Sequence, residues 1–221
     1  MRQGLRSSST RQLILDSTAS QICRLGYGLT SLSVIATNAG VNLGSIYYHF
    51  KTKLAVSEEI GRREQAIWAT FVDELQERPD RGLVALAGLS ILVARRTATD
   101  SQARATVILA TDPGAKDAGL RPMVPAWLVS IQALLNEALL LGQIDIDDGL
   151  DIERLPSLLL GWFLGEITVR DLISHDPTAD ARANAVQITR DLLRAGGFHS
   201  YQWYLDSATA LVDGFCVRSS Y

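Results

Sequence analysis

The 221-residue sequence predicts an all-α fold with two parts, a three-helix N-terminal helix-turn-helix domain and a C-terminal helical domain. Apolar residues recur every three or four positions through most of the chain, and the alternation typical of strands is missing. Glycines and prolines interrupt this pattern at helix-length intervals. The apolar share of 47% is enough for a core without disulfide or metal staples. We place the domain boundary between 1–53 and 54–221.

The first helix is predicted over 11–25. Leu15, Ala19 and Ile22 fall on one of its faces, and the hydroxyl residues at 8–10 are candidate N-caps. The segment Gly26-Tyr27-Gly28 ends this helix, because glycine tolerates the left-handed conformation found at helix C-termini.

Three capping residues divide the next stretch into helices. Ser31 caps a helix over 32–39 that ends at Gly40, with its inward residues at Leu32, Ile35 and Ala36. Asn42 caps a short helix over 43–49. Thr52 caps a long helix to about residue 77, where Pro79 forbids continuation. We expect the inward stripe of that long helix at Ile60, Ile67, Trp68, Phe71, Val72 and Leu75.

The C-terminal part predicts six more helices, near 82–98, 101–111, 124–142, 152–175, 179–195 and 200–213. Asp151 and Thr178 are the candidate N-caps of two of them, and Gly196-Gly197 closes another. The segment 155–169 is apolar on nearly every side, so every side must be covered. We expect a second subunit to cover part of it in a twofold homodimer; the alternative is a central core helix.

Charge is unevenly divided along the chain. Residues 1–56 contain six basic residues against one acidic residue, whereas the remainder contains 15 basic and 23 acidic residues. A basic segment on an acidic body favours a nucleic-acid or acidic partner for that segment; the alternative is ordinary variation of a solvated surface. Arg2, Arg6 and Arg11 are candidate phosphate contacts on a flexible arm.

The helices 32–39 and 43–49, joined by Gly40-Val41-Asn42, form a helix-turn-helix, whose second helix enters the major groove of DNA. Ile46 and Phe50 are four residues apart and face inward. The recognition helix contains no Arg or Gln for bidentate base contacts, which favours readout by apolar contact and DNA shape. The residues expected to face DNA are Asn42, Leu43, Gly44, Ser45, Tyr47, Tyr48, His49 and Lys53.

Lys53 lies in the first turn of the long helix, where a cation is unfavourable for the helix dipole. This position favours a partner such as a phosphate. The alternative is a lysine that is simply solvated.

These residues carry a family resemblance. The segments Leu-Gly-Tyr-Gly-Leu-Thr-Ser-Leu-Ser-Val-Ile-Ala at 25–36 and Ala-Gly-Val-Asn-Leu-Gly-Ser-Ile-Tyr-Tyr-His-Phe-Lys-Thr-Lys at 39–53 resemble the DNA-binding domain of tetracycline-repressor (TetR) family regulators. The resemblance implies an all-helical, dimeric, ligand-responsive repressor with the DNA-facing residues named above. Asn42 and Leu54 depart from the usual Ser or Thr and the usual Glu of the family.

The body is similar to the γ-butyrolactone autoregulator receptors that regulate antibiotic biosynthesis, through segments 120–127, 134–143 and 158–165. In those receptors a tryptophan matching Trp127 lines the ligand pocket. An apolar ligand with a polar head needs an apolar slot and a few orienting groups. The expected lining residues are Trp127, Trp68, Phe71, Val107, Gln132 and Trp162, with Thr106 or Thr168 as further orienting groups; plain core packing is the alternative for each.

One ionisable residue falls within the apolar segment 155–169. Glu166 requires a partner or water there, and Arg170 one turn later is the candidate for an ion pair.

The expected function is therefore a homodimeric transcriptional repressor that binds a double-stranded DNA operator and a small-molecule effector, in the cytoplasm and without a membrane. The sequence contains neither nucleotide-binding nor hydrolase motifs, so we expect no enzyme, cofactor or metal. Cys23 and Cys216 are expected to be reduced thiols. The alternatives are a repressor of an efflux or metabolic gene that responds to another hydrophobic compound, and a helical protein-interaction module without DNA binding.

Overall fold

The computed structural model describes residues 2–75, 78, 81–115, 123–144, 152–173, 181–195, 198 and 201–218. All regular structure in these ranges is helical, which confirms the predicted all-α class. The helices pack into two units, Met1–Ala66 with Asp100–Val124 (unit 1) and Ile67–Thr99 with Pro125–Tyr221 (unit 2). The start of the fourth helix and the sixth helix thus pack with the N-terminal helices. The boundary after residue 53 stays a prediction.

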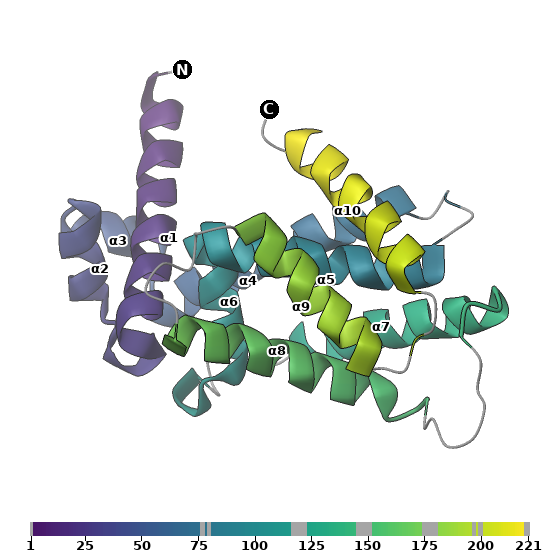
Figure 1. Ribbon diagram of the computed structural model, residues 1–221. Helices are drawn as coiled ribbons and strands as arrows, with labels where there is room; N and C mark the ends of the chain where they lie inside the picture. Colours follow the sequence, from purple (N-terminus) through teal and green to yellow (C-terminus); the bar gives the residue numbers. More distant parts are fainter. Residues whose placement is uncertain are drawn as a thin grey trace. The chain divides into compact units, whose positions relative to one another are not determined.

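Unit 1 is built around its first helix. Helix α1 (Arg2–Leu29) contacts α2 (Leu32–Ala39), α3 (Leu43–His49) and α6 (Ser101–Thr111), which is followed by the 3₁₀ turn η1 (Pro113–Ala115) (Figure 1). Helix α4 (Lys53–Leu75) begins in this unit and continues into unit 2. The fully buried core includes the predicted inward residues of the first three helices, Leu15, Ala19, Ile22, Ile35 and Ile46.

The two ends of α1 differ from the prediction. The helix begins at Arg2 rather than near residue 11, so the hydroxyl residues at 8–10 lie within it instead of capping it. The prediction of a flexible arm is wrong, because the backbone of these residues is helical. Serine and threonine lower helix stability only slightly, and no proline interrupts this stretch. At the other end Gly26 has φ of 76° and breaks the helix as predicted, but one more turn follows to Leu29.

The local caps agree with the sequence. The Ser31 side chain accepts from the Val34 amide (3.3 Å), and Gly40 ends α2 in the left-handed conformation. The Asn42 carboxamide oxygen accepts from the Ser45 amide at 2.8 Å. The Thr52 hydroxyl accepts from the Ala55 amide at 3.1 Å. These bonds set the starts of α2, α3 and α4 and thereby fix the helix-turn-helix.

Unit 2 is organised around α5 (Arg81–Thr99), which is buried along nearly its whole length. It packs against α8 (Leu155–Ile173), α9 (Ala181–Ala195) and α10 (Tyr201–Arg218) (Figure 1). The end of α4 and helix α7 (Met123–Leu140) complete the unit. All six predicted C-terminal helices are present. The predicted caps Asp151 and Thr178 and the stop at Gly196-Gly197 lie outside the described residues.

Among the described residues, two helices are long and apolar enough to cross a membrane, whereas the sequence led us to expect no membrane. In α5 the apolar window is 78% buried inside the protein, and in α7 it is 28% buried. The core helix of a globular protein passes the same test, so length and composition are weak evidence here.

Candidate functional site

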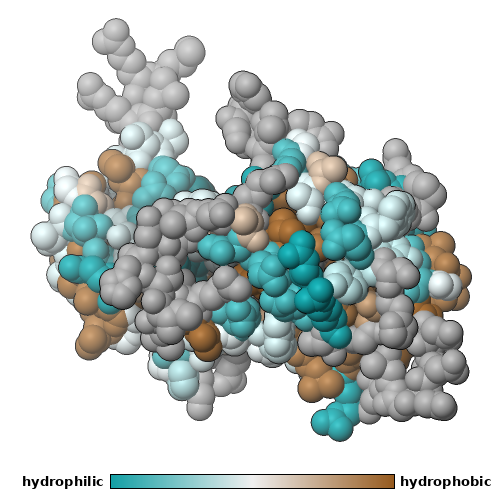
Figure 2. All heavy atoms as spheres, in the orientation of Figure 1, coloured by the Kyte–Doolittle hydropathy of each residue, from teal (hydrophilic) through white to brown (hydrophobic). Residues whose placement is uncertain are grey.

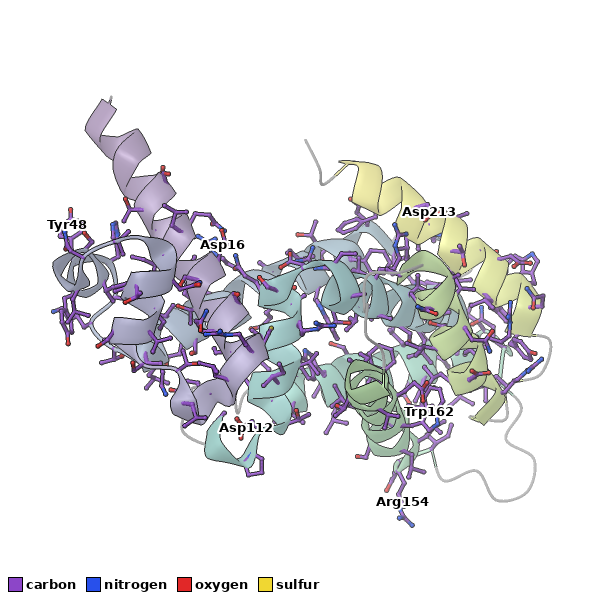
Figure 3. All side chains as sticks on the ribbon, turned by 60° about the vertical axis from the view of Figure 1, so that its left-hand side comes forward. Asp16, Tyr48, Asp112, Arg154, Trp162 and Asp213 are labelled. Carbon is purple, nitrogen blue, oxygen red and sulfur yellow. The ribbon has the colours of Figure 1, made fainter. Side chains whose placement is uncertain are left out.

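Helix α3, the predicted recognition helix, divides its residues between the core and the surface. Ile46 is fully buried and Phe50 is 5% exposed, while the Phe50 amide donates to the Ile46 carbonyl (2.7 Å) and ends the helix. Tyr48 is 80% exposed and points away from the neighbouring helices in Figure 3. Tyr47 and Leu43 are also exposed. Two inward anchors therefore hold a helix whose outer face presents aromatic and apolar side chains.

Ser45 and His49, two further residues of this face, contact their neighbours in the chain. The Ser45 hydroxyl donates to the Asn42 carboxamide oxygen at 3.1 Å, so both polar groups contribute to the cap. The His49 ring meets the Tyr48 ring edge to face at 5.0 Å, and His49 is half-buried. Gly44 is exposed, which leaves the backbone of the first turn open to close approach. What these residues contact outside the chain stays a prediction.

Lys53 has an intramolecular partner that the sequence did not indicate. Its ammonium donates to the Tyr27 carbonyl at 2.7 Å and lies 3.9 Å from the centre of the Tyr27 ring. Burial lowers the pKa of Lys53 from its ordinary value. An ammonium has three N–H donors, so two remain for other partners. The carbonyl and the ring offset the unfavourable placement of this cation in the first turn of α4.

Glu59 joins α4 to α1 through a cluster of arginines. The Arg11 guanidinium donates to Glu59 at 2.8 Å and lies 4.9 Å above the ring of Phe50, the residue that ends α3. Arg62 and Arg63 donate to the same carboxylate at 2.8 and 2.9 Å. These bonds, from Arg62 first, hold the pKa of Glu59 well below its usual range, against the opposing effect of burial.

The predicted flexible arm is wrong for Arg11, which lies within α1 and contacts Glu59 and the Phe50 ring. Its contact with a phosphate stays a prediction. The side chains of Arg2 and Arg6 lie outside the described residues. Arg62 and Arg63 follow Glu59 by three and four residues, a spacing that predicts ion pairs on one face of a helix, so this part of the cluster could be predicted from the sequence. The contact of Glu59 with Arg11 of α1, 48 residues away, could not be predicted from the sequence.

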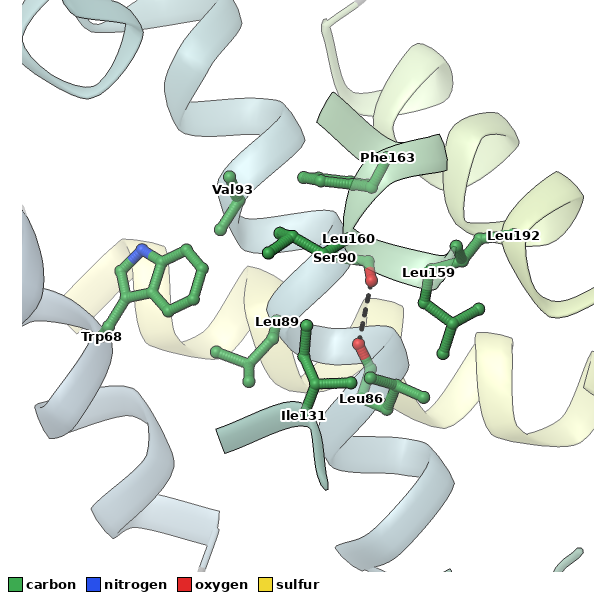
Figure 4. A pocket seen from close by; sticks show the side chains of 10 residues that line it. All are labelled: Trp68, Leu86, Leu89, Ser90, Val93, Ile131, Leu159, Leu160, Phe163 and Leu192. Carbon is green, nitrogen blue, oxygen red and sulfur yellow. Dashed lines mark hydrogen bonds between the residues drawn. The ribbon is translucent and has the colours of Figure 1, made fainter. Parts of the chain in front are cut away.

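Unit 2 contains an apolar cavity of about 40 Å³. Apart from the indole of Trp68, Ser90 is the polar member of its lining, and the Ser90 hydroxyl donates to the Leu86 carbonyl at 3.0 Å (Figure 4). Such a volume holds about three water molecules, whereas pockets for drug-sized ligands are roughly 300–1,000 Å³. The lining residues are Trp68, Leu86, Leu89, Ser90, Val93, Ile131, Leu159, Leu160, Phe163 and Leu192.

Among the predicted ligand residues, two tryptophans pack together, and one of them lies at this cavity. Trp68 lines it, and Trp127, which is 6% exposed, stacks on Trp68 at 5.4 Å with an interplanar angle of 22°. Trp162 is half-buried on α8, in the turn that also carries the lining residues Leu160 and Phe163.

Trp127, Trp162 and the remaining predicted ligand residues do not line this cavity. Phe71 is fully buried and packs edge to face against Phe215 at 5.0 Å, as a core residue. Val107 is buried in α6 and belongs to unit 1. Gln132 donates to the Asn136 side chain on an exposed part of α7. Thr106 and Thr168 donate to the carbonyls of residues 102 and 164 in their own helices.

The lining residues of α5 were not predicted from the sequence. Leu86, Leu89, Ser90 and Val93 recur at three- and four-residue spacing, which places them on one face. The same spacing occurs on every face of this buried helix, so periodicity did not single out the lining.

Residues 14–60 match the model of the bacterial regulatory proteins, tetR family. Over these residues the chain is similar to the tetR family. The HTH-type transcriptional regulator AcrR of Shigella flexneri is 34% identical over 99 residues, 44% of this chain and 46% of that protein. The chain thus spans about half the length of this curated relative.

The likeness to solved structures extends beyond the tetR-family domain. CprB, a TetR family protein from S. coelicolor A3(2), superposes with a TM-score of 0.77 at 23% identity, over 94% of this chain and 98% of that chain. A gamma-butyrolactone receptor described as an ArpA like protein gives a TM-score of 0.74 at 24% identity, over 95% and 99%. These likenesses establish the two-part helical fold.

Proposed function

We propose that the chain is a transcriptional repressor that binds a pseudo-palindromic operator as a homodimer and is released by a small, largely apolar effector. The observation that carries the proposal is the outer face of α3. Tyr47 and Tyr48 stand exposed on a helix anchored by buried Ile46 and Phe50, within a domain similar to the tetR family. Exposing large aromatic side chains to water is unfavourable, so a partner surface that covers them has a physical rationale.

The chemistry of this face suits DNA. The phenol groups of Tyr47 and Tyr48 and the two remaining N–H donors of Lys53 provide hydrogen bonds to phosphates, and Leu43 provides an apolar contact for a thymine methyl. The face has no bidentate base reader, so DNA shape supplies much of the specificity. Two recognition helices about 34–36 Å apart, one from each subunit, would enter successive major grooves.

Helix α8 supports the homodimer. Its inner side is buried, but Leu158 and Val169 are 59% and 50% exposed, so it is not a central core helix of a single chain. Gly161 and Gly165 lie on the same stripe, and a Cβ added to either would meet nothing within 4 Å. Figure 2 shows hydrophobic atoms at the lower edge of the drawn face, where the first turns of α8 lie in Figure 1. A second α8 would cover this stripe closely.

The cavity of unit 2 supports the choice of effector. Its lining accepts an alkyl or aryl group, and Trp68, which stacks on Trp127, provides an aromatic wall. A γ-butyrolactone-like signal with an alkyl tail has such a group. The cavity must enlarge to admit it, so the effector selects a conformation with an opened unit 2 and shifts the population away from the DNA-competent state.

The test is operator binding by the dimeric protein. Fluorescence anisotropy with a duplex selected from a random pool by the native chain should give a complex that Tyr48→Ala weakens by about tenfold or more. Leu29→Ala is the matched control, because Leu29 is 75% exposed in the same unit but outside α3. Equal effects of the two variants, or no selected duplex at low salt, would leave the helical interaction module as the better description.

A second candidate differs only in the effector. Ser90 already donates its hydroxyl to the Leu86 carbonyl, so the cavity favours ligands without a demanding polar head. This favours a repressor of an efflux or metabolic gene induced by another hydrophobic compound. Thermal shift with a γ-butyrolactone and with its ring-opened, tail-matched acid and alcohol separates the two candidates, because only a lactone receptor distinguishes the heads.

A further inference from the structure

The break in α1 changes the hydrogen bonding of the backbone of one residue, Tyr27. Gly26 has φ of 76° and ψ of 167°, and a Cβ at this position would stand 3.7 Å from the Asp112 carboxylate. In an uninterrupted helix the amide and the carbonyl of Tyr27 would pair with residues four positions away. The non-helical Gly26 turns these groups toward other partners.

Both groups of Tyr27 bind side chains from distant helices of unit 1. The Tyr27 amide donates to Asp112 Oδ2 at 3.4 Å, from the residue that ends α6. The Tyr27 carbonyl accepts from Lys53 Nζ at 2.7 Å and from the Thr30 amide at 3.2 Å. Asp112 is itself held by the Gly114 amide, which donates to Oδ1 at 2.7 Å. Figure 3 shows Asp112 beside the C-terminal end of α1.

We propose that Asp112 and Tyr27 are positioning residues for Lys53. The contacts of Tyr27 with Asp112 and Lys53, the Tyr27 bridge, connect the end of α6 to the first turn of α4. Through this bridge α6 fixes where the Lys53 ammonium stands and which of its donors remain for a phosphate. The proposal rests on the proposed function, in which Lys53 contacts DNA.

The physical benefit is preorganisation. A lysine has a flexible four-carbon stem, and holding it against a phosphate costs rotamer entropy at the moment of binding. The Tyr27 carbonyl and ring restrict Lys53 before DNA arrives. The cap Asn42 and the anchor Phe50 act within α3 or next to it, whereas Asp112 lies 85 residues from Tyr27. The Tyr27 bridge therefore makes DNA contact depend on the position of α6.

The bridge has a spectroscopic signature that needs no DNA. Because Lys53 Nζ lies above the Tyr27 ring, the ring current should move the Lys53 ε-methylene protons upfield in the native dimer. Asp112→Ala should reduce this displacement, and Asp112→Asn, which keeps an oxygen acceptor, should retain most of it. Asp100→Ala is the matched control, since Asp100 caps the other end of α6 and accepts from the Gln102 amide at 2.8 Å.

Operator affinity tests the consequence. Asp112→Ala should weaken binding by about three- to tenfold, the range for loss of one hydrogen bond, while Asp112→Asn should restore most of the affinity. In a Lys53→Met background Asp112→Ala should have no further effect, because the two residues act in series. Circular dichroism and sedimentation of each variant check that fold and dimer are kept.

Each outcome has a separate meaning. An unchanged ε-methylene shift in Asp112→Ala overturns the bridge, whatever the DNA result. A lost shift with full operator affinity, or equal losses in the two Lys53 backgrounds, overturns the positioning role and leaves the proposed function intact. Failure of the native chain to bind any selected duplex overturns the proposed function, while the shift still reports whether the bridge exists.

Discussion

Unit 1 and unit 2 are each stabilised internally by a different kind of interaction. In unit 1, polar side chains join helices that are far apart in sequence: Ser17 donates to the Ile35 carbonyl at 2.8 Å, and Gln102 donates to Asp16 at 2.7 Å. In unit 2, the central helix α5 is buried among apolar side chains, and the ion pair of Arg95 with Asp213 (2.6 Å) lies partly exposed near its end.

The two units should differ in rigidity, because polar interactions depend on direction and apolar burial does not. Hydrogen bonds and ion pairs fix distances and angles, so they suit a unit that, under the proposed function, presents one surface to a rigid duplex. Apolar burial is non-directional, and apolar neighbours can repack around a guest at modest cost. We expect unit 1 to respond sharply to loss of single polar groups and unit 2 to tolerate changes of side-chain shape, except where backbone meets backbone.

The largest expected effect tests that exception. Gly82→Ala should lower the free energy of unfolding by about 3–5 kcal/mol, because Gly82 has φ of 38° and its Cβ would stand 2.9 Å from the Ala138 Cα. Urea denaturation at one fixed protein concentration measures the change. Gly214→Ala, where a Cβ meets nothing within 4 Å, should be neutral or stabilising. Similar values for both variants would contradict a close backbone approach at Gly82.

The second test breaks the polar cluster of unit 1. Glu59→Gln should cost about 2–3 kcal/mol at neutral pH, because a carboxylate that accepts from three arginines is replaced by a weaker acceptor. Urea denaturation again reads the change. Glu58→Gln, at the exposed neighbouring position, is the matched control and should change stability by less than about 0.5 kcal/mol.

The same cluster predicts a pH dependence. The folded pKa of Glu59 is below its unfolded value of about 4.3, so its stabilisation is complete above that pH. It decreases as the pH falls below that value and is lost once the pH passes the folded pKa. The native chain should therefore lose stability on acidification more steeply than Glu59→Gln. Parallel curves for the two proteins would show that Glu59 does not carry the effect.

A smaller effect is expected at the proposed dimer face. Gly161→Ala should favour the α8 helix itself by about 1 kcal/mol yet raise the dimer dissociation constant by about tenfold, because the methyl group obstructs a close second helix. Sedimentation equilibrium measures the dissociation constant. Gly28→Ala, exposed at the end of α1, should leave it unchanged. A Gly161→Ala dimer of native affinity would exclude this stripe from the interface.

The smallest effect tests the cavity. Val93→Ile adds one methylene to the lining of a 40 Å³ space and should stabilise the chain by about 0.8 kcal/mol while weakening effector binding. Val84→Ile makes the same change on the same helix at a fully buried position outside the cavity, and it should destabilise by about 1 kcal/mol or more. Destabilisation by both variants would mean that the cavity cannot accept a methylene.

In the candidate site, the faces of α3 could be predicted from the sequence and the lining of the cavity could not. The inward and outward residues of α3 followed from a four-residue spacing, and Ile46, Phe50 and Tyr48 lie as that spacing predicts. The lining of the cavity did not follow, because aromatic and apolar residues suit a core and a pocket equally well. Phe71 was predicted for the pocket but packs on Phe215, which lies more than one hundred residues away along the chain.

The sequence alone determined the features that depend on neighbours within about one helical turn, namely the order of the helices, the caps at Ser31, Asn42 and Thr52, and the break at Gly26. Tertiary structure decided the features that join distant segments. Arg11 binds Glu59, Lys53 binds Tyr27, and Val107 packs with the N-terminal helices instead of the cavity. A cap closes a hydrogen bond between residues three apart, which spacing reveals, whereas a contact across 48 or 85 residues exists only after the chain has folded.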